Sequence, residues 1–268
     1  MNVVVVDRPA DGICRILINR PAKRNAIDFE VREQMYQALV AAKADAAVRA
    51  VVLGGVEGVF SAGGDLDSMG RLDEVGARER MQHIHRLCKL LGHFPIPVVS
   101  AVEGFCAGAA VGVSLLGDFI VVGQGSKIIF PFMGLGLVPD WGGMMLLPRR
   151  VGVAKARQLM TAGKTTSGEE AYRIGLADEY VGEADIMAAA IVLAETMALL
   201  PQAAFARFKE RLNHPSASLE EELQREEDDQ AVLLLGAEFN EGYGAVMDKR
   251  SADFSTIARE ITDAGEQA

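Results

Sequence analysis

Short apolar runs alternate with longer amphipathic segments over the first two thirds of this chain. The apolar runs predict strands at 3–6, 13–19, 49–56, 96–104 and 118–123, the first two flanking a turn-forming segment, 7–12. The amphipathic segment 28–45 predicts a helix with Asp28 as its N-cap and a buried face made of Val31, Met35, Ala38, Leu39 and Ala42. Strands that alternate with helices predict an α/β fold with mostly parallel pairing.

The last third of the chain follows a different pattern. Ser167 and Glu170 form a capping box at the start of a short helix. From about residue 185 onward the pattern is helical, with a break at Pro201. The sequence therefore predicts an α/β core in residues 1–195 and a helical C-terminal region in residues 196–268.

Composition and charge narrow the classes of partner. The chain has 268 residues, 50% of them hydrophobic, which is enough to bury a large core. Its formal net charge of -10 argues against nucleic acid or an anionic membrane as the main partner. The most apolar stretch, 96–123, is interrupted by Glu103 and Asp118 and does not read as a membrane span.

The spacing of cysteines and histidines predicts no metal site. Cys14, Cys88 and Cys106 show neither metal-ligand nor redox-motif spacing and read as buried thiols of a reducing compartment. His83 and His85 are two residues apart, so on a helix they face different directions. The N-terminus has no basic region followed by a long apolar run, which argues against a secretory signal. We therefore expect a cytoplasmic protein.

Three stretches rich in small residues, 60–66, 102–112 and 136–143, stand out as candidate chemistry. Small residues let backbone N–H groups approach a ligand closely, and the N-terminus of a helix adds partial positive charge at the same point. Two such amides aimed at one atom would form an oxyanion hole. Tight packing of strand ends against helices would require the same residues, so composition alone leaves both explanations open.

Asp140 is the one acidic residue of the third stretch. It lies between Pro139 and the pair Gly142–Gly143, a setting typical of a turn or of a helix N-cap. The local sequence favours that structural role over proton transfer. The rest of the chain shifts the balance.

Six segments occur in an order and spacing that resemble the crotonase family of enoyl-CoA hydratases and isomerases: "LINRPAKRNAID", "FSAGGDL", "VEGFCAGAAVG", "GLGLVPDWGGMMLLPRRVG", "TAGKTTSGEEAYRIGLADEYV" and "EGYGAVMDKRSADF". The resemblance covers essentially the whole chain. It implies a spiral of ββα units in residues 1–195, and a C-terminal region in 196–268 that oligomerises and covers the site. It also implies an acyl-CoA substrate, with coenzyme A as part of the substrate and no separate cofactor, and a homotrimer or dimer of trimers.

The resemblance also assigns individual residues. It places the two oxyanion amides at Ala62 and Ala109. The loop that contacts the adenine would comprise Ser61, Ala62, Gly64, Asp65 and Leu66, and the segment along the nucleotide would comprise Lys23, Arg24 and Ala26. Lys249 would reach the CoA phosphates, often of a neighbouring subunit, and Phe254 would pack near the adenine.

The departures from the family pattern concern catalysis. Hydratases of this family use two glutamates, and Gly112 and Phe132 stand at those positions here. Asp140 instead resembles the single catalytic aspartate of the epoxide and enoyl isomerases of phenylacetate breakdown. We expect an acyl pocket formed by Phe132, Met133, Trp141 and Gly112, whose apolar side chains would raise the pKa of Asp140.

A single carboxylate is sufficient to move a proton between two carbons while an oxyanion hole holds the enolate. The sequence therefore favours an acyl-CoA isomerase that shifts a double bond or rearranges a ring epoxide. Two alternatives stay open among enzymes: a hydratase-like activity, and other crotonase chemistry such as dehalogenation with an aspartate nucleophile. A protein that binds acyl-CoA without catalysis is the third.

Overall fold

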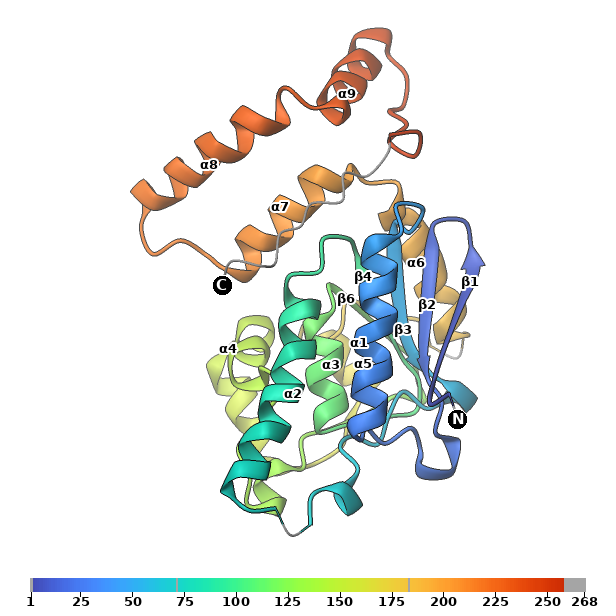
Figure 1. Cartoon of the computed structure of the whole chain (residues 1–268), viewed down its shortest axis with the longest axis vertical. Coiled ribbons are helices and arrows are strands. Elements are labelled where there is room, and N and C mark those ends of the chain that lie inside the picture. The colour runs from blue at the N-terminus through green and yellow to red at the C-terminus, as the bar shows by residue number, and fades with distance from the viewer. Residues whose placement is uncertain (1, 71, 183, 258–268) are drawn as a thin grey trace.

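The predicted strands form the centre of the molecule. The computed structural model describes residues 2–70, 72–182 and 184–257. The main sheet has the order β1-β2-β3-β4-β6-β9 (Figure 1), comprising Val4–Ala10, Ile13–Ile18, Ala50–Gly55, Val98–Val102, Phe119–Val122 and Glu179–Tyr180. β1 and β2 pair antiparallel, whereas the other neighbouring strands of this sheet pair in parallel. The expected α/β class with mostly parallel pairing is confirmed, although β1 continues to Ala10 and shortens the predicted turn.

Helices cover both faces of this sheet (Figure 1). On one face, α1 (Phe29–Ala44), α2 (Glu74–Gly92) and α3 (Ala109–Leu116) enclose the larger hydrophobic core. On the other face, α6 (Ile186–Ala198) packs its alanine-rich side against β2, β3, β4 and β6. All residues of β3 and β4 are buried, which explains why these strands read as continuous apolar runs in the sequence.

The first helix forms for the reasons the sequence indicates, with one exception. The Asp28 carboxylate accepts a hydrogen bond from the Val31 N–H at 2.9 Å and so caps α1. The predicted face is buried except for Ala38, which is only partly covered. Arg32 is buried in addition, where its Nε donates to His83 Nδ1 at 3.0 Å. This hydrogen bond offsets part of the cost of burying the charge, since Arg32 Nη1 is buried without a partner among the described residues.

A second, three-stranded sheet lies beside the main one. It has the order β5-β7-β8, comprising Phe105–Ala107, Lys127–Ile129 and Thr166–Ser167. α4 (Gly143–Ala162) bends at Gly152, and α5 (Gly168–Arg173) begins where Ser167 accepts from the Glu170 N–H at 3.2 Å, as the capping box predicts. The described residues also form four short 3-10 helices, η1 to η4, at Pro21–Lys23, Val56–Gly58, Leu66–Ser68 and Phe132–Leu135.

The C-terminal helices leave the core. After the break at Pro201 come α7 (Gln202–Asn213), α8 (Leu219–Leu233) and α9 (Ala237–Asp248), and α8 and α9 project as an arm (Figure 1). None of the fifteen described residues of α8 is buried. Among the described residues, no single helix is long and apolar enough to cross a membrane; only α6 and α7 taken together, bent by 110°, pass on length and composition.

Candidate active site

Two loops rich in small residues lie side by side at the start of α3. The Ser61 N–H donates to the Phe105 carbonyl at 2.9 Å, and the Ala107 N–H donates back to the Ser61 carbonyl at 3.2 Å. Gly63, with φ +96°, lies where the two loops come very close together. A Cβ at this position would lie 2.4 Å from the Ala107 carbonyl oxygen and 3.6 Å from the Ala109 nitrogen. The glycine is thus required for both conformation and space.

Some backbone N–H groups of these loops have no hydrogen-bond acceptor within the described chain. Ala109 is the first residue of α3, where an N–H has no intrahelical acceptor, and the residues described offer it none elsewhere. The N–H of Ala62 donates to the Arg24 carbonyl at 2.9 Å. Ala62 therefore does not fit the donor role that we assigned to it. Gly64, two residues later, has no acceptor for its N–H within the described ranges.

Asp140 does not hold its turn or cap its helix through its side chain. α4 begins at Gly143 with Gly142 as N-cap, and no side chain caps it. The turn is closed by backbone instead, since the Gly143 N–H donates to the Asp140 carbonyl oxygen at 2.9 Å. The turn and the helix start therefore do not depend on the Asp140 carboxylate, in contrast to the structural role that the local sequence favoured.

The surroundings of Asp140 favour a proton acceptor. Its Oδ1 is buried and has no hydrogen-bond partner among the described residues. An unpaired buried polar atom costs about 1–3 kcal/mol, more when charged, so the fold keeps this carboxylate at a cost in stability. Burial raises the pKa of Asp140, while a backbone hydrogen bond and the charges of Arg80 and His85 oppose that rise. Both of these side chains belong to α2.

Trp141 packs against Gly112, the position to which the motif resemblance assigns the first hydratase glutamate. A Cβ at Gly112 would lie 2.2 Å from the Trp141 Cβ, so no side chain fits at position 112 beside this indole. Trp141 is 2% exposed and has φ +52°, a conformation that costs a bulky residue roughly 1–3 kcal/mol. The pair Gly112–Trp141 therefore excludes the glutamate sterically and fixes the chain next to Asp140.

The remaining residues of the expected acyl pocket differ in burial. Phe132, at the second glutamate position, is buried, and its Cζ would lie 3.9 Å from a Cβ at Gly108. Its ring therefore reaches the turn just before Ala109. Met133, the next residue, is 47% exposed. The structure thus brings Phe132, Trp141 and Gly112 together near the start of α3, and leaves Met133 toward solvent.

Arg80 is a feature of this site that the sequence did not reveal. Its Nη1 donates to Ser68 Oγ at 3.2 Å, and its Nη2 would lie 3.6 Å from a Cβ at Gly64. Burial lowers the pKa of Arg80, and the charges of Asp140 and Asp65 oppose this. Within the described ranges it has no carboxylate within ion-pair distance, so this half-buried cation lies beside Gly64 and acts on Asp140 through its charge. Nothing in the sequence spacing marks it, because its role depends on how α2 packs.

The loop assigned to the nucleotide is organised around Asp65. Asp65 Oδ2 lies 3.0 Å from Arg20 Nη2 and 3.3 Å from Lys23 Nζ. The carboxylate also accepts a hydrogen bond from the Asp67 N–H. Burial would raise the pKa of Asp65, but hydrogen bonds from Arg20 and Lys23 hold it below the ordinary value. The other assigned residues lie around it: Ser61 and Ala26 are buried, Leu66 is 59% exposed, and Arg24 stacks over the Phe105 ring.

The two C-terminal residues assigned to coenzyme A lie elsewhere in the chain's own fold. Lys249 ends α9 in a left-handed conformation and is exposed. The Phe254 ring packs against α9, 3.7 Å from where Gly242 would place a Cβ. Figure 1 shows α9 at the end of the molecule opposite the first turn of α2. One chain alone therefore does not bring these residues to the loops around Ala109.

Known proteins with similar sequences are enoyl-CoA hydratases and isomerases. The sequence profile described as enoyl-CoA hydratase/isomerase matches residues 8–256. The chain is 32% identical over 253 residues to the 1,2-epoxyphenylacetyl-CoA isomerase of Escherichia coli K12, covering 91% of this chain and 95% of that one. The 2,3-dehydroadipyl-CoA hydratase of the same organism is 28% identical over 255 residues, covering 95% and 99%.

The fold of the chain is also that of a solved structure of this class. The enoyl-CoA hydratase of Bacillus anthracis superposes with a TM-score of 0.88 at 26% identity, covering 95% of this chain and 99% of that one. The crotonase-type fold expected from the six motifs is thereby confirmed. The chain belongs to the enoyl-CoA hydratase/isomerase family.

Proposed function

We propose that this member of the family is an acyl-CoA isomerase that uses Asp140 as its only proton-transfer group. The observation that carries the proposal is the partly buried Asp140 carboxylate, whose Oδ1 is buried and has no partner among the described residues. It lies next to Trp141, whose Cβ leaves no room for a side chain at Gly112, the position that the resemblance assigns to the first hydratase glutamate. The similarity to the 1,2-epoxyphenylacetyl-CoA isomerase of E. coli supports the same choice.

The reaction follows from the groups that the site offers. The N–H groups of Gly64 and Ala109 would donate to the thioester oxygen of a 3-enoyl-CoA. Asp140 would remove a proton from C2, and the electron pair would delocalise over the double bond and the thioester as a dienolate. The same carboxyl group would then return the proton at C4, which moves the double bond to C2–C3. One base and one oxyanion hole balance every atom and electron of this step.

The assignment of Gly64 in place of Ala62 completes the oxyanion hole. The Gly63 approach to Ala107 and Ala109 brings the two loops together, and the Gly64 amide is the free donor of the first loop. The Arg80 guanidinium near Gly64 adds positive charge where the enolate forms. A positioned donor in such a site contributes about 3–4 kcal/mol to transition-state stabilisation.

Exchange in heavy water tests the proposed reaction directly. A 3-enoyl-CoA and its 2-enoyl isomer are incubated with the enzyme in D2O and followed by NMR. We expect deuterium at C2 and C4 together with migration of the double bond, and no 3-hydroxyacyl-CoA. Accumulation of the 3-hydroxyacyl product at a rate comparable to exchange would favour a hydratase. Tight binding without exchange would show a binding protein that lacks the reaction.

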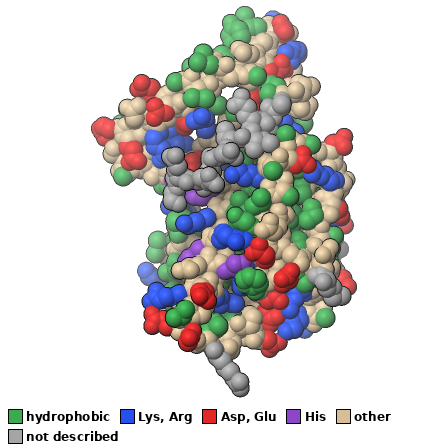
Figure 2. All heavy atoms as spheres, viewed as in Figure 1, with side chains coloured by type: hydrophobic (Ala, Val, Ile, Leu, Met, Phe, Trp, Pro, Cys, Tyr) green, Lys and Arg blue, Asp and Glu red, His purple; other side chains and the backbone are tan. Residues whose placement is uncertain are grey.

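We propose in addition that the protein acts as a homotrimer or dimer of trimers. The arm formed by α8 and α9 exposes many apolar side chains, among them Leu235 at 84% and Val246 at 75% exposure. Figure 2 shows apolar side chains along this arm. A surface of this kind indicates a partner. Assembly would also carry Lys249 and Phe254 to the nucleotide of a neighbouring chain, and light scattering after gel filtration measures the expected mass.

A further inference from the structure

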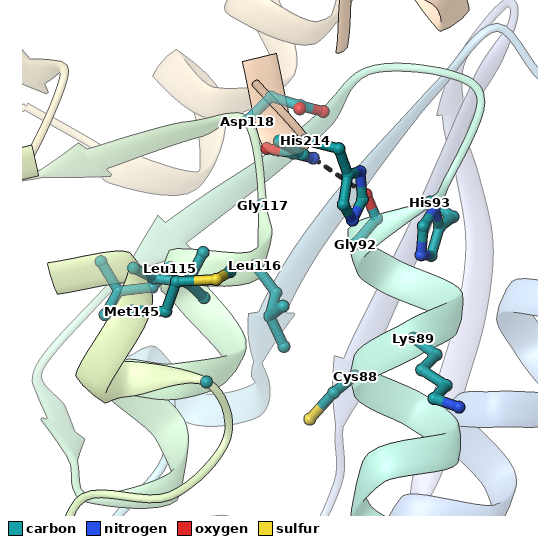
Figure 3. A pocket seen from close by; sticks show the side chains of 13 residues that line it. Cys88, Lys89, Gly92, His93, Leu115, Leu116, Gly117, Asp118, Met145 and His214 are labelled. Atoms are coloured by element: carbon teal, nitrogen blue, oxygen red, sulfur yellow. Dashed lines mark hydrogen bonds between the residues drawn. The ribbon is translucent and has the colours of Figure 1, made fainter. Parts of the chain in front are cut away.

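A cluster of two histidines and a glutamate lies away from the candidate active site, where α7 meets the end of α2. His93 Nδ1 lies 3.0 Å from Oε2 of Glu210, and His214 Nδ1 lies 3.0 Å from the other carboxylate oxygen, Oε1. The two imidazole rings stack with centroids 4.7 Å apart and an angle of 7° between planes. Figure 3 shows His93 and His214 side by side at one end of a cavity of about 210 Å³, which they line together with Cys88 and Asn213.

The backbone that carries this cluster is fixed on both sides. Lys209, next to Glu210, is 4% exposed and forms an ion pair of 2.9 Å with Asp118. Asn213, next to His214, donates from Nδ2 to the Gly92 carbonyl at 2.9 Å. These two contacts fix α7 to the core at Lys209 and Asn213, the residues directly before Glu210 and His214. The three side chains therefore converge because the fold holds their Cα atoms, not only because they bond one another.

The donor set is one that transition metals prefer. Glu210 and His214 are four residues apart and share one face of α7 and its C-terminal cap, and His93 is the C-cap of α2. The three side chains place one ligand atom each within 4.8 Å of one another. Two imidazole nitrogens with one carboxylate oxygen suit Zn²⁺ far better than Mg²⁺ or Ca²⁺, which take oxygen ligands.

We propose that His93, Glu210 and His214 bind one Zn²⁺ ion per chain. A tetrahedral zinc ion with Zn–N bonds of about 2.0–2.1 Å needs its ligand atoms roughly 3.3 Å apart. His93 lies 3.0 Å from one oxygen of Glu210 and His214 lies 3.0 Å from the other, and one ligand atom from each side chain lies within 4.8 Å of the other two, so the three must draw closer to hold one ion. The side chains are 46–49% exposed, so the two imidazole rings can rotate out of their stacked arrangement and metal can enter from solvent. The fourth position is left to a water molecule.

Zinc at this position would join two distant parts of the chain. His93 and Glu210 are 117 residues apart and belong to the core and to the base of the C-terminal arm. Figure 2 shows histidine side chains at the surface where the arm joins the core. A ligand that binds only the folded state raises the melting temperature. The site therefore predicts stabilisation of the protein by zinc, independent of its catalytic activity.

The test is titration of the untagged, full-length protein with zinc. After treatment with EDTA and dialysis, calorimetry with ZnCl2 should give one site per chain, and the melting temperature should rise by several degrees at saturation. His93→Ala and His214→Ala should each weaken binding at least tenfold, and Glu210→Gln should weaken it because the carboxamide keeps the size of the side chain but removes its negative charge. His85→Gln is the matched control. His85 is an exposed histidine within α2, the helix whose C-cap is His93.

Cobalt substitution distinguishes a built site from loose surface binding. Co²⁺ in a four-coordinate site with nitrogen ligands should give intense visible absorption, which the histidine variants should lose and the control should keep. The melt of each metal-free variant shows whether it folds. Equal zinc affinity in wild type, His93→Ala and His214→Ala would overturn the proposal. So would the absence of saturable binding in a wild-type protein that melts normally.

Discussion

Replacing Gly112 by alanine should destabilise the protein, although glycine-to-alanine changes inside helices usually stabilise. Gly112 lies within α3, where alanine is favoured over glycine by about 1 kcal/mol on helix propensity. The added Cβ, however, would lie 2.2 Å from the Cβ and 3.1 Å from the Cγ of Trp141. The Cβ of Trp141 is attached directly to the backbone, so side-chain rotation cannot relieve the contact.

The expected size of the effect follows from these two terms. Overpacking a tight interior costs typically 1–3 kcal/mol, and a contact that moves backbone belongs at the upper end of this range. After the gain of about 1 kcal/mol from propensity, the net loss is about 2 kcal/mol. For a protein of this size a loss of 1 kcal/mol lowers the melting temperature by about 2–4 °C, which predicts a decrease of about 4–8 °C.

Thermal melts of the wild type and of two variants test this reasoning. Gly244→Ala serves as the matched control, because Gly244 also lies inside a helix and the nearest atom to an added Cβ is Arg250 Nη2 at 3.9 Å. This control should melt at or slightly above the wild-type temperature. If Gly112→Ala behaves like Gly244→Ala, the contact with Trp141 is not what requires glycine at position 112.

Four further predictions concern catalysis and CoA binding. Hydration of crotonyl-CoA should be far below the typical enzyme rate of about 10 per second, because both glutamate positions lack a carboxylate; loss of the conjugated absorbance near that rate contradicts this. Because burial raises the pKa of Asp140 and only the carboxylate accepts a proton, kcat/KM should rise with pH to a plateau, with its midpoint above the usual aspartate value of about 3.9. Arg80→Met should shift that midpoint higher by removing a neighbouring positive charge, and an unchanged midpoint would show that Arg80 does not act on the carboxylate. Lys249→Ala should weaken CoA binding by about 1 kcal/mol or more, chiefly at low salt, whereas Lys164→Ala should have little effect on it. Equal losses of affinity in calorimetry would show that Lys249 does not contact the CoA phosphates.

Periodic and capped segments were predictable from the sequence because their signals are local. The apolar runs of β3 and β4, the Asp28 cap of α1 and the capping box at Ser167 all appear in the structure as expected. The helical last third was likewise evident from its pattern and from Pro201. Each of these features depends on residues within a few positions of one another.

The parts of the site that the sequence did not predict depend on contacts between distant segments. Ala62 looked like a free donor until the fold placed the Arg24 carbonyl 2.9 Å from its nitrogen. Arg80 reaches the neighbourhood of Gly64 only through the packing of α2. The histidine cluster joins residues 93 and 214, whereas sequence spacing drew attention to His83 and His85 instead. Long-range geometry of this kind has no signature in local spacing.

The substitution Asp140→Asn tests the central claim, that the partly buried carboxylate of Asp140 is the proton-transfer group. Asparagine keeps the size of the side chain, and the turn is closed by backbone, so the fold has no use for the lost charge. A carboxyl group whose pKa is raised in the folded state binds its proton more tightly there, so its ionisation destabilises the protein as pH rises above about 3.9. At pH 7 the asparagine variant should therefore be at least as stable as the wild type.

The decisive measurement is the turnover of a 3-enoyl-CoA by wild type and Asp140→Asn, with a thermal melt and a CoA titration of each. A positioned acid/base group contributes roughly 10²- to 10⁴-fold, so turnover should fall by that factor while melting temperature does not decrease and CoA affinity stays the same. A variant that folds normally, binds CoA normally and keeps more than about a tenth of wild-type turnover, well short of that range, would contradict the account.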